Sequence, residues 1–154
     1  MSSRSDRSID DRLSPREQEL WRAIKKLGEF ALSAVGNEIE AATGLSGADF
    51  GVLSRLEDLG GGRLGQKELA LSLGWDKSRL SHQLTRMGGR RLLRRDPLTS
   101  ARGMTIRILS AGRRAIAAAR PVHAIAVRKH ILQFIGSAEE QALLALAGHL
   151  NSAV

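Results

Sequence analysis

The segment 66–108 constrains the fold most, because two closely spaced helical patterns in it give way to an alternating one. The first pattern runs from Gln66 to Leu73, and Gly74 then supplies the left-handed turn that ends helices. Asp76 caps a second helix, which we expect to run to about Met87. Since only a tight corner separates the two helices, the pattern predicts a helix-turn-helix.

After this corner, the side chains come to alternate between polar and apolar, as in a β-strand. Leu92 and Leu93 lead into a basic segment, and beyond a polar loop the residues 105–108 alternate between polar and apolar side chains. This pattern predicts a hairpin that is basic on one face. A helix-turn-helix followed directly by such a hairpin is a winged helix.

Helical patterns also lie on both sides of this unit. Ser14, Pro15 and Glu17 form a helix start with a capping box, and the apolar spacing continues to about Ala42. Ser46 caps a shorter helix that ends at the glycines 60–62. A long helical pattern begins at Ser110, and a last one follows Gly136 and Ser137.

The expected fold is therefore mainly α with a small β-hairpin wing. We expect a disordered arm over residues 1–13 and a single domain over 14–154, with the winged helix at about 45–110. The flanking helices, at about 15–42 and 111–152, are apolar on more than one side. This favours pairing with a second copy of the chain, so we interpret them as dimerisation helices.

Charge is concentrated in the centre of the chain. The formal net charge is +8, and residues 61–120 hold 14 Lys and Arg against 3 Asp and Glu. The excess predicts a polyanionic partner, either nucleic acid or a membrane surface. A solvated basic face without a partner is the alternative.

Several other classes of protein are disfavoured by composition. The chain has no cysteine, which excludes disulfides and thiol chemistry. It has no apolar run near the roughly 20 residues that span a bilayer, and no secretory signal pattern, so we expect a cytoplasmic protein. His123 and His130 are seven residues apart, whereas metal pairs usually sit three or four apart, so we expect no metal site. No Ser/His/Asp set and no phosphate-binding Gly-x-x-x-x-Gly-Lys motif is recognisable, so we expect no cofactor and no enzyme activity.

The sequence resembles the MarR family of bacterial transcriptional regulators from Leu13 to about Leu150. The stretches that carry the resemblance are LSGADFGVLSRL, GQKELALSLGWDKSRLSHQLTRM, the ARG at 101–103, and SAGRRAIAAARPVHAIAVRKHI. The resemblance implies a homodimer with interleaved terminal helices and two winged-helix lobes that meet adjacent major grooves of double-stranded DNA.

The second helix of the corner is the expected recognition helix. Leu80, Leu84 and Met87 form its buried stripe, and Arg79, His82, Gln83 and Arg86 are expected to form the opposite, exposed stripe. We interpret the polar residues as base readers, since Arg pairs with guanine and Gln with adenine, with hydroxyls beside them. The candidates on this helix are Lys77, Ser78, Arg79, Ser81, His82, Gln83, Thr85 and Arg86.

Other DNA contacts are expected around this helix. By resemblance, Arg102 at the wing tip enters the minor groove, and Asp96 braces it across the loop. Gln66 and Lys67 are candidates for phosphate contacts at a helix start. Arg94, Arg95 and Arg107 are further candidates for phosphate contacts.

The chain departs from the family pattern at two helix ends. Arg91 stands where members have glycine, and Gly88 and Gly89 come a turn earlier, so we expect the recognition helix to stop early. Leu109 replaces the threonine that caps the helix after the wing. We therefore expect Ser110 to serve as that cap.

These observations predict a sequence-specific regulator, a repressor of a pseudo-palindromic operator. Family members often bind small aromatic or amphipathic effectors, and Trp21, Ile24, Phe50 and His123 are candidates for such a pocket, although residues of these types more often simply belong to the core. The alternative function is a sequence-indifferent DNA-coating or protein-interaction winged helix.

Overall fold

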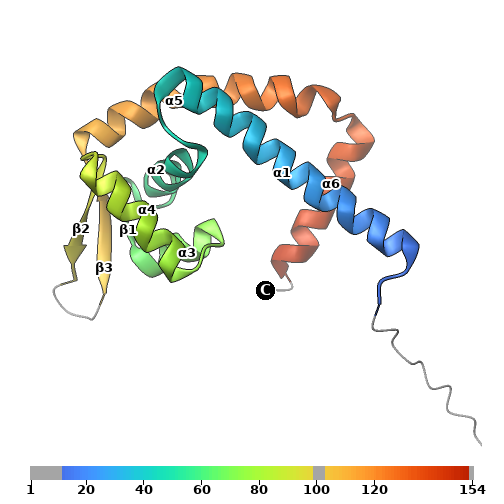
Figure 1. The fold of residues 1–154 in the computed structure, drawn as a ribbon, viewed down its shortest axis with the longest axis horizontal. Coiled ribbons are helices and arrows are strands. Elements are labelled where there is room, and N and C mark those ends of the chain that lie inside the picture. Colours follow the sequence, from blue (N-terminus) through green and yellow to red (C-terminus); the bar gives the residue numbers. More distant parts are fainter. Residues whose placement is uncertain (1–11, 99–102, 153–154) are drawn as a thin grey trace, which may run out of the picture.

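A computed structural model describes residues 12–98 and 103–152 of the chain (Figure 1). Most of the expected arm at 1–13 therefore lies outside the described residues. The elements in chain order are α1 Pro15–Thr43, α2 Gly47–Gly60, β1 Arg63–Gly65, α3 Gln66–Leu73, α4 Lys77–Gly89, β2 Leu93–Pro97, β3 Met104–Ile108, α5 Ser110–His130, the short 3-10 helix η1 Leu132–Phe134, and α6 Ser137–Ser152.

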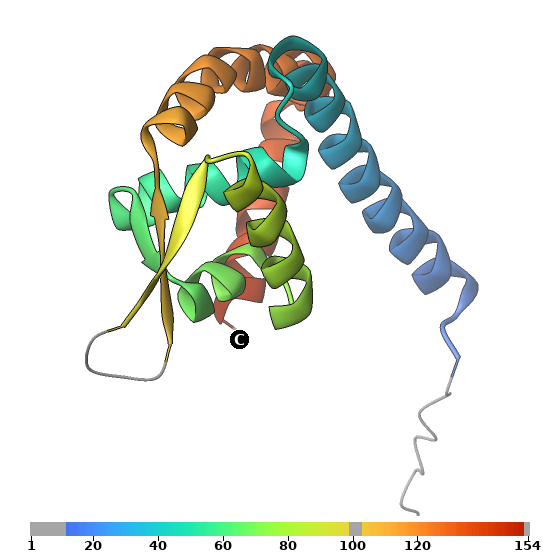
Figure 2. The same cartoon turned by 60° about the vertical axis from the view of Figure 1, so that its left-hand side comes forward.

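The predicted mainly helical fold with a hairpin wing is confirmed. The helices α2, α3 and α4 and an antiparallel sheet of order β1-β3-β2 form one unit, which we call the lobe. The helices α1 and α5 pack against each other above it, and α1 extends well beyond the lobe (Figures 1 and 2). The strand β1 is not predicted by the sequence pattern, since it has only three residues.

The hydrophobic core lies in the lobe and at the adjoining ends of α1 and α5. Leu80, Leu84 and Met87 of α4 are buried, as their spacing predicts. They pack with apolar residues of α2, the sheet and α5 in one cluster. The core fixes α4 with one face inward, and this determines which of its side chains meet solvent.

Most of the predicted helix caps are confirmed. The Ser14 side chain accepts from the N–H of Glu17, and the Ser14 N–H donates to the Glu17 carboxylate at 2.7 Å. The backbone bond from Ser14 holds the pKa of Glu17 below its ordinary value. Asp76 caps α4, and Gly74 has the left-handed φ of 64°.

Two expectations about helix ends are wrong. The helix α4 continues through Gly88 and Gly89, because Arg91 itself adopts a left-handed φ of 57°. The N–H of Leu92 then bonds to the Met87 carbonyl at 3.1 Å and closes the helix end. Ser110 does not cap α5, since Leu109 is the cap residue and makes no side-chain bond.

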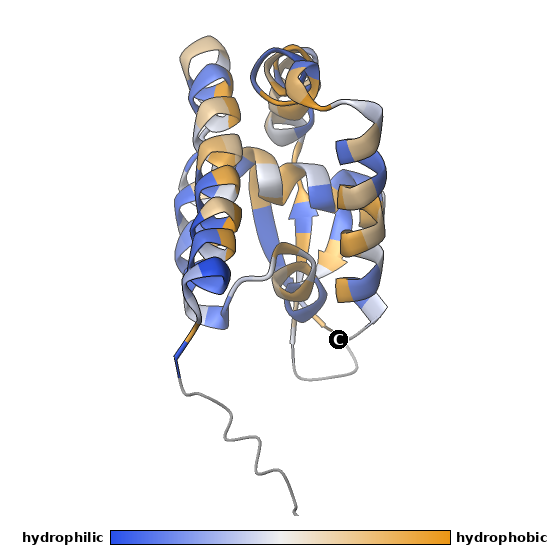
Figure 3. Cartoon of the chain, turned by 90° about the vertical axis from the view of Figure 1, so that its right-hand side faces the viewer, coloured by the Kyte–Doolittle hydropathy of each residue, from blue (hydrophilic) through white to orange (hydrophobic). Residues whose placement is uncertain are grey.

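The terminal segments, residues 13–33 and 131–152, contrast with the lobe because they contain no buried residue. Large apolar side chains are exposed on them, including Leu20, Trp21, Leu27, Phe30, Leu143, Leu144 and Leu150. Figure 3 shows apolar residues of α1 and α6 on the sides where these two helices face the space between them. None of the described helices is long and apolar enough to cross a membrane.

Candidate nucleic-acid interface

The exposed face of α4 is centred on Ser78, His82, Thr85 and Gly89. At about 100° per residue these four positions lie within about 60° of one another. They lie opposite the buried apolar stripe of the helix, and all four are exposed. The centre of the face therefore carries two hydroxyls and one imidazole.

Gln83 does not lie on this face, so the prediction of an exposed stripe through Gln83 is wrong. Its side chain is only 4% exposed, and its Nε2 donates to Oδ1 of Asp49 at 2.7 Å. The physical reason is rotational. On the helix surface Gln83 lies about 40° from buried Met87, and there it meets the N-terminal turn of α2, to which Asp49 belongs.

Arg79 and Arg86 lie on one flank of the exposed face, seven residues apart. The guanidinium of Arg79 stacks on the ring of Trp75 at 4.3 Å from its centroid. Arg86 donates from Nη2 to Oε1 of Gln83. Both guanidiniums are thus held by a neighbour, and both residues are exposed.

Arg95 of β2 lies on the other flank. Its Nη2 donates to the Ser81 carbonyl at 2.8 Å, and its Nη1 donates to Oγ1 of Thr85 at 3.3 Å. These bonds tie the wing to α4 and place a half-buried positive charge beside the exposed face. The phosphate contact expected of Arg95 stays a prediction.

The other candidates on the helix-turn-helix lie at helix starts. Lys77 is exposed in the first turn of α4, and Lys67 is exposed in the first turn of α3. Gln66 is half-buried at the first position of α3. The cap residue of α3 is Gly65, which offers no side-chain acceptor to the helix N–H groups. These groups are oriented as anion-binding helix starts require.

A row of arginines crosses the outer face of the sheet. Arg63, Arg107 and Arg94 stand opposite one another on β1, β3 and β2. Asp96 pairs with Arg63 at 3.5 Å, with Arg107 at 2.7 Å and with Arg94 at 2.9 Å. The expected brace from Asp96 to Arg102 involves a residue outside the described ranges. Within them, one carboxylate faces three guanidiniums, so the sheet keeps a positive excess.

The four residues predicted for an effector pocket fall into two groups. Phe50 of α2 and His123 of α5 stack with ring centroids 4.6 Å apart. Burial, and secondarily the charge of Arg120, lowers the pKa of His123. Trp21 and Ile24 are exposed on the first half of α1. The structure of the single chain brings together only the first pair.

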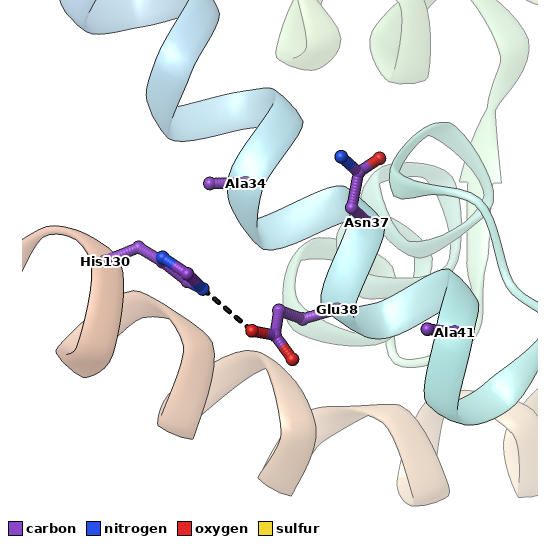
Figure 4. Close-up of a pocket in the computed structure, with 5 residues that line it drawn as sticks. All are labelled: Ala34, Asn37, Glu38, Ala41 and His130. Carbon is purple, nitrogen blue, oxygen red and sulfur yellow. Dashed lines mark hydrogen bonds and ion pairs between the residues drawn. The ribbon is translucent and has the colours of Figure 1, made fainter.

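A shallow hollow of about 270 Å³ lies between α1 and α5 (Figure 4). Glu38 and His130 point toward each other across it, with His130 Nε2 2.8 Å from the carboxylate. Lys129 donates to the same oxygen at 2.7 Å, and these two bonds, Lys129 first, lower the pKa of Glu38. The sequence reasoning missed this cluster, which joins the end of α5 to α1.

Solved structures with the same fold include transcriptional regulators. AbsC of Streptomyces coelicolor, a MarR family regulator, is 28% identical, with 93% of this chain and 99% of that chain covered and a TM-score of 0.77. Sco3205 of the same organism, also a MarR family regulator and solved in complex with DNA, is 22% identical, with coverages of 94% and 91% and a TM-score of 0.83.

A third neighbour is described as a sensor of organohalides. The organohalide-sensing regulator RdhR-CbdbA1625, solved with 2,4-dichlorophenol, is 18% identical, with coverages of 99% and 90% and a TM-score of 0.77. No family model matches this chain, and no curated protein matches it significantly. These three neighbours are named as regulators rather than as enzymes.

Proposed function

The chain has the winged-helix fold of the MarR family of transcriptional regulators, and we propose from this premise that it binds double-stranded DNA sequence-specifically as a homodimeric repressor. The observation that carries the proposal is the exposed face of α4. It presents His82 between two hydroxyls, with Arg79 and Arg86 on one side and Arg95 on the other. Arginine and histidine side chains at this site suit base edges and phosphates in a major groove.

The terminal segments support the homodimer. Residues 13–33 and 131–152 expose many large apolar side chains, more than a soluble monomer usually leaves in water. A second copy of the chain is the proposed partner for this surface. Two lobes held by one dimer then meet half-sites about one helical turn apart, which predicts a pseudo-palindromic operator.

A small aromatic or amphipathic effector is the regulatory part of the proposal. The neighbour solved with 2,4-dichlorophenol supports it by analogy. In this chain the stacked rings of Phe50 and His123 join the lobe to α5, and we propose them as the first contact to test. An effector bound there would act by favouring a lobe spacing that no longer fits two adjacent grooves. We place such a regulator in the cytoplasm, with the chromosome.

The second candidate is a sequence-indifferent DNA-coating or protein-interaction function. The arginine row of Arg63, Arg107 and Arg94 favours it, because a row of this kind attracts phosphates without reading bases. The two candidates differ in one measurable quantity. A specific regulator prefers its site over random DNA, typically by about 10³-fold or more, whereas a coating protein shows only a steep salt dependence.

The deciding experiment starts from selection of binding sites out of a random DNA library. The selected duplex and the DNA upstream of the chain's own gene are then titrated by fluorescence anisotropy at several salt concentrations, with random competitor. We expect a two-fold symmetric selected sequence that is preferred by at least ~10³-fold. Enrichment of no sequence, together with a steep salt slope, would contradict the specific function and support the coating function.

A further inference from the structure

The buried carboxylate of Asp49 accepts hydrogen bonds from two separate parts of the chain, the start of α2 and the helix α4 with its cap. Asp49 is only 3% exposed. Its Oδ2 accepts from the N–H of Ser46 at 3.0 Å and from Nη1 of Arg90 at 2.6 Å, while its Oδ1 accepts from Nε2 of Gln83 at 2.7 Å. A buried carboxylate is tolerated when it is paired and hydrogen-bonded in this way.

Helix capping alone does not explain this arrangement. The capping box of α1 has the same chemistry, with Ser14 at the cap and Glu17 three residues later, and its carboxylate is exposed. Asp49 occupies the equivalent position in α2. It differs in accepting two further bonds from residues 34 and 41 positions away, both belonging to α4 or its cap. Asp49 therefore links the start of α2 to α4.

The link continues through Gln83 to Arg86. A carboxylate only accepts hydrogen bonds and a guanidinium only donates them, whereas the amide of Gln83 does both. With Nε2 directed at Asp49, Oε1 is left to accept from Nη2 of Arg86. The charge of Asp49 thus sets the orientation of the Gln83 amide, and the amide holds the guanidinium of Arg86 on the flank of the exposed face.

A second arm of the network holds the end of the helix. Arg90, the C-cap residue of α4, donates to Asp49 from Nη1 and to the carbonyl of Gly44 from Nη2 at 3.1 Å. Gln83 and Arg90 are seven residues apart and so share one side of α4. Two attachments on one side, two turns apart, oppose rotation of α4 about its own axis.

We propose that Asp49 is a positioning residue for sequence recognition, which acts on DNA through Gln83 and Arg86 without touching it. The inference rests on the proposed function. It assigns to a buried residue of α2 part of the discrimination between DNA sequences. It also gives Gln83 a role that differs from base reading.

The test uses the sequence that the wild-type protein selects from a random library. Asp49→Asn removes the charge but keeps the size of the side chain, so the amide of Gln83 is no longer held in one orientation. We expect the preference for the selected sequence over random DNA to fall about tenfold, the size of one lost base contact. Affinity for random DNA and its salt slope should stay the same, since Asp49 is buried away from any phosphate.

Asp58→Asn is the control, because it removes a carboxylate from the same helix, α2, that bonds to Arg120 of α5 and not to α4. It leaves the contacts of Gln83 and Arg86 unchanged, so the sequence preference should remain at the wild-type value. Circular dichroism and thermal melting of both variants establish that each is folded at the assay temperature. If Asp49→Asn does not fold, Gln83→Met is the substitute, since it breaks the link to Arg86 and should cause the same loss.

The double variant Asp49→Asn with Gln83→Glu tests whether Asp49 acts on Arg86 through the hydrogen bonds of Gln83. It exchanges the two side-chain chemistries, so the new carboxylate at position 83 would accept from the new amide at position 49 and still accept from Arg86. We therefore expect the sequence preference to recover. In an Arg86→Met background, Asp49→Asn should cause little further loss of preference. If Asp49→Asn lowers the sequence preference by the same factor in the Arg86→Met background as in the wild type, the two residues act independently. That result would overturn the proposed route through Arg86.

Two results would overturn the inference while leaving the proposed function intact. One is an unchanged sequence preference in folded Asp49→Asn and Gln83→Met. The other is an equal fall in affinity for selected and random DNA, which would indicate a purely structural role. Failure of the wild-type protein to select any sequence is a different result, because it would overturn the proposed function itself and remove the recognition that Asp49 is proposed to support.

Discussion

The helices α2 and α6 are similar in length and both rich in leucine, yet only one of them is packed. The helix α2 buries Val52, Leu53 and Leu56 in the lobe. The helix α6 exposes Leu143, Leu144, Leu146 and Leu150 and buries nothing. An apolar helical pattern shows that a helix needs a partner, but it does not show whether the partner lies in the same chain.

The same contrast divides the chain as a whole. The lobe has a buried core made mostly of leucines and isoleucines, whereas the terminal segments contain no buried residue and expose their large apolar side chains. The lobe therefore has the rigidity that holds a recognition helix in place. The terminal segments have the apolar surface that we propose joins two lobes.

The largest effect is expected in the core of the lobe. Leu53→Ala empties a fully buried position in α2 and should lower the free energy of unfolding by about 3 kcal/mol. Leu71 of α3 is the matched control, because it is 83% exposed and Leu71→Ala should change the free energy by less than about 0.5 kcal/mol. Urea unfolding followed by circular dichroism measures both. Equal losses would contradict the assignment of the core to the lobe.

A substitution in the terminal segments should weaken self-association of the chain and leave the folding of the lobe unchanged. Leu144 of α6 is 66% exposed, and Leu144→Glu places a carboxylate in the proposed dimer surface. We expect association to weaken by at least about tenfold, because the charge is desolvated without a partner. Light scattering after size exclusion measures the mass over a dilution series. Leu71→Glu is the control, and a wild-type monomer at all concentrations would disprove the proposed dimer.

A substitution on the exposed face of α4 should reduce the preference for the selected sequence without reducing the affinity for random DNA. His82→Ala removes the one imidazole at the centre of the exposed face and should lower the preference for the selected sequence by roughly tenfold. Lys67→Ala should instead weaken binding to all sequences and reduce the salt slope by about one. Anisotropy titrations with selected and random duplexes separate the two. A uniform loss in His82→Ala would place base reading elsewhere.

The exposed face of α4 could have been predicted correctly from the sequence. Leu80, Leu84 and Met87 define the buried direction, and the point opposite to them lies between Ser78 and His82. The stripe predicted from the longest polar side chains, Arg79, His82, Gln83 and Arg86, is centred about 60° away from that point. The buried stripe was therefore a better guide to the exposed face than the polar residues were.

Other features depended on contacts that no local pattern reports. The caps at Ser14 and Asp76 follow from adjacent residues and are predicted correctly. The bond between Asp49 and Gln83 joins positions 34 residues apart, and it requires the packing of α2 against α4. The strand β1 is equally non-local, because its three residues become a strand only by pairing with β3.

A substitution at the end of α4 should have a smaller effect, and it should increase the stability of the lobe. Arg91 adopts a φ of 57°, which costs a residue with a Cβ about 1–2 kcal/mol, and glycine adopts this conformation freely. After allowance for the entropy of glycine in the unfolded chain, Arg91→Gly should stabilise the lobe by roughly 0.5–1 kcal/mol. Thermal melting should show a rise of a few degrees. Arg114→Gly, inside α5, is the opposite control and should destabilise by about 1 kcal/mol.

The smallest effect concerns His123, where the lobe meets α5. Burial first, and then the charge of Arg120, lowers the pKa of His123 in the folded protein below its ordinary value of about 6.5. The unfolded chain therefore takes up this proton first as the pH falls, so the contribution to stability is complete above about pH 6.5 and declines below it. Urea unfolding at pH values of about 7.5 and about 5.5, on either side of the ordinary histidine pKa, measures the decline. His123→Phe keeps an aromatic ring against Phe50 and should reduce the difference between the two pH values.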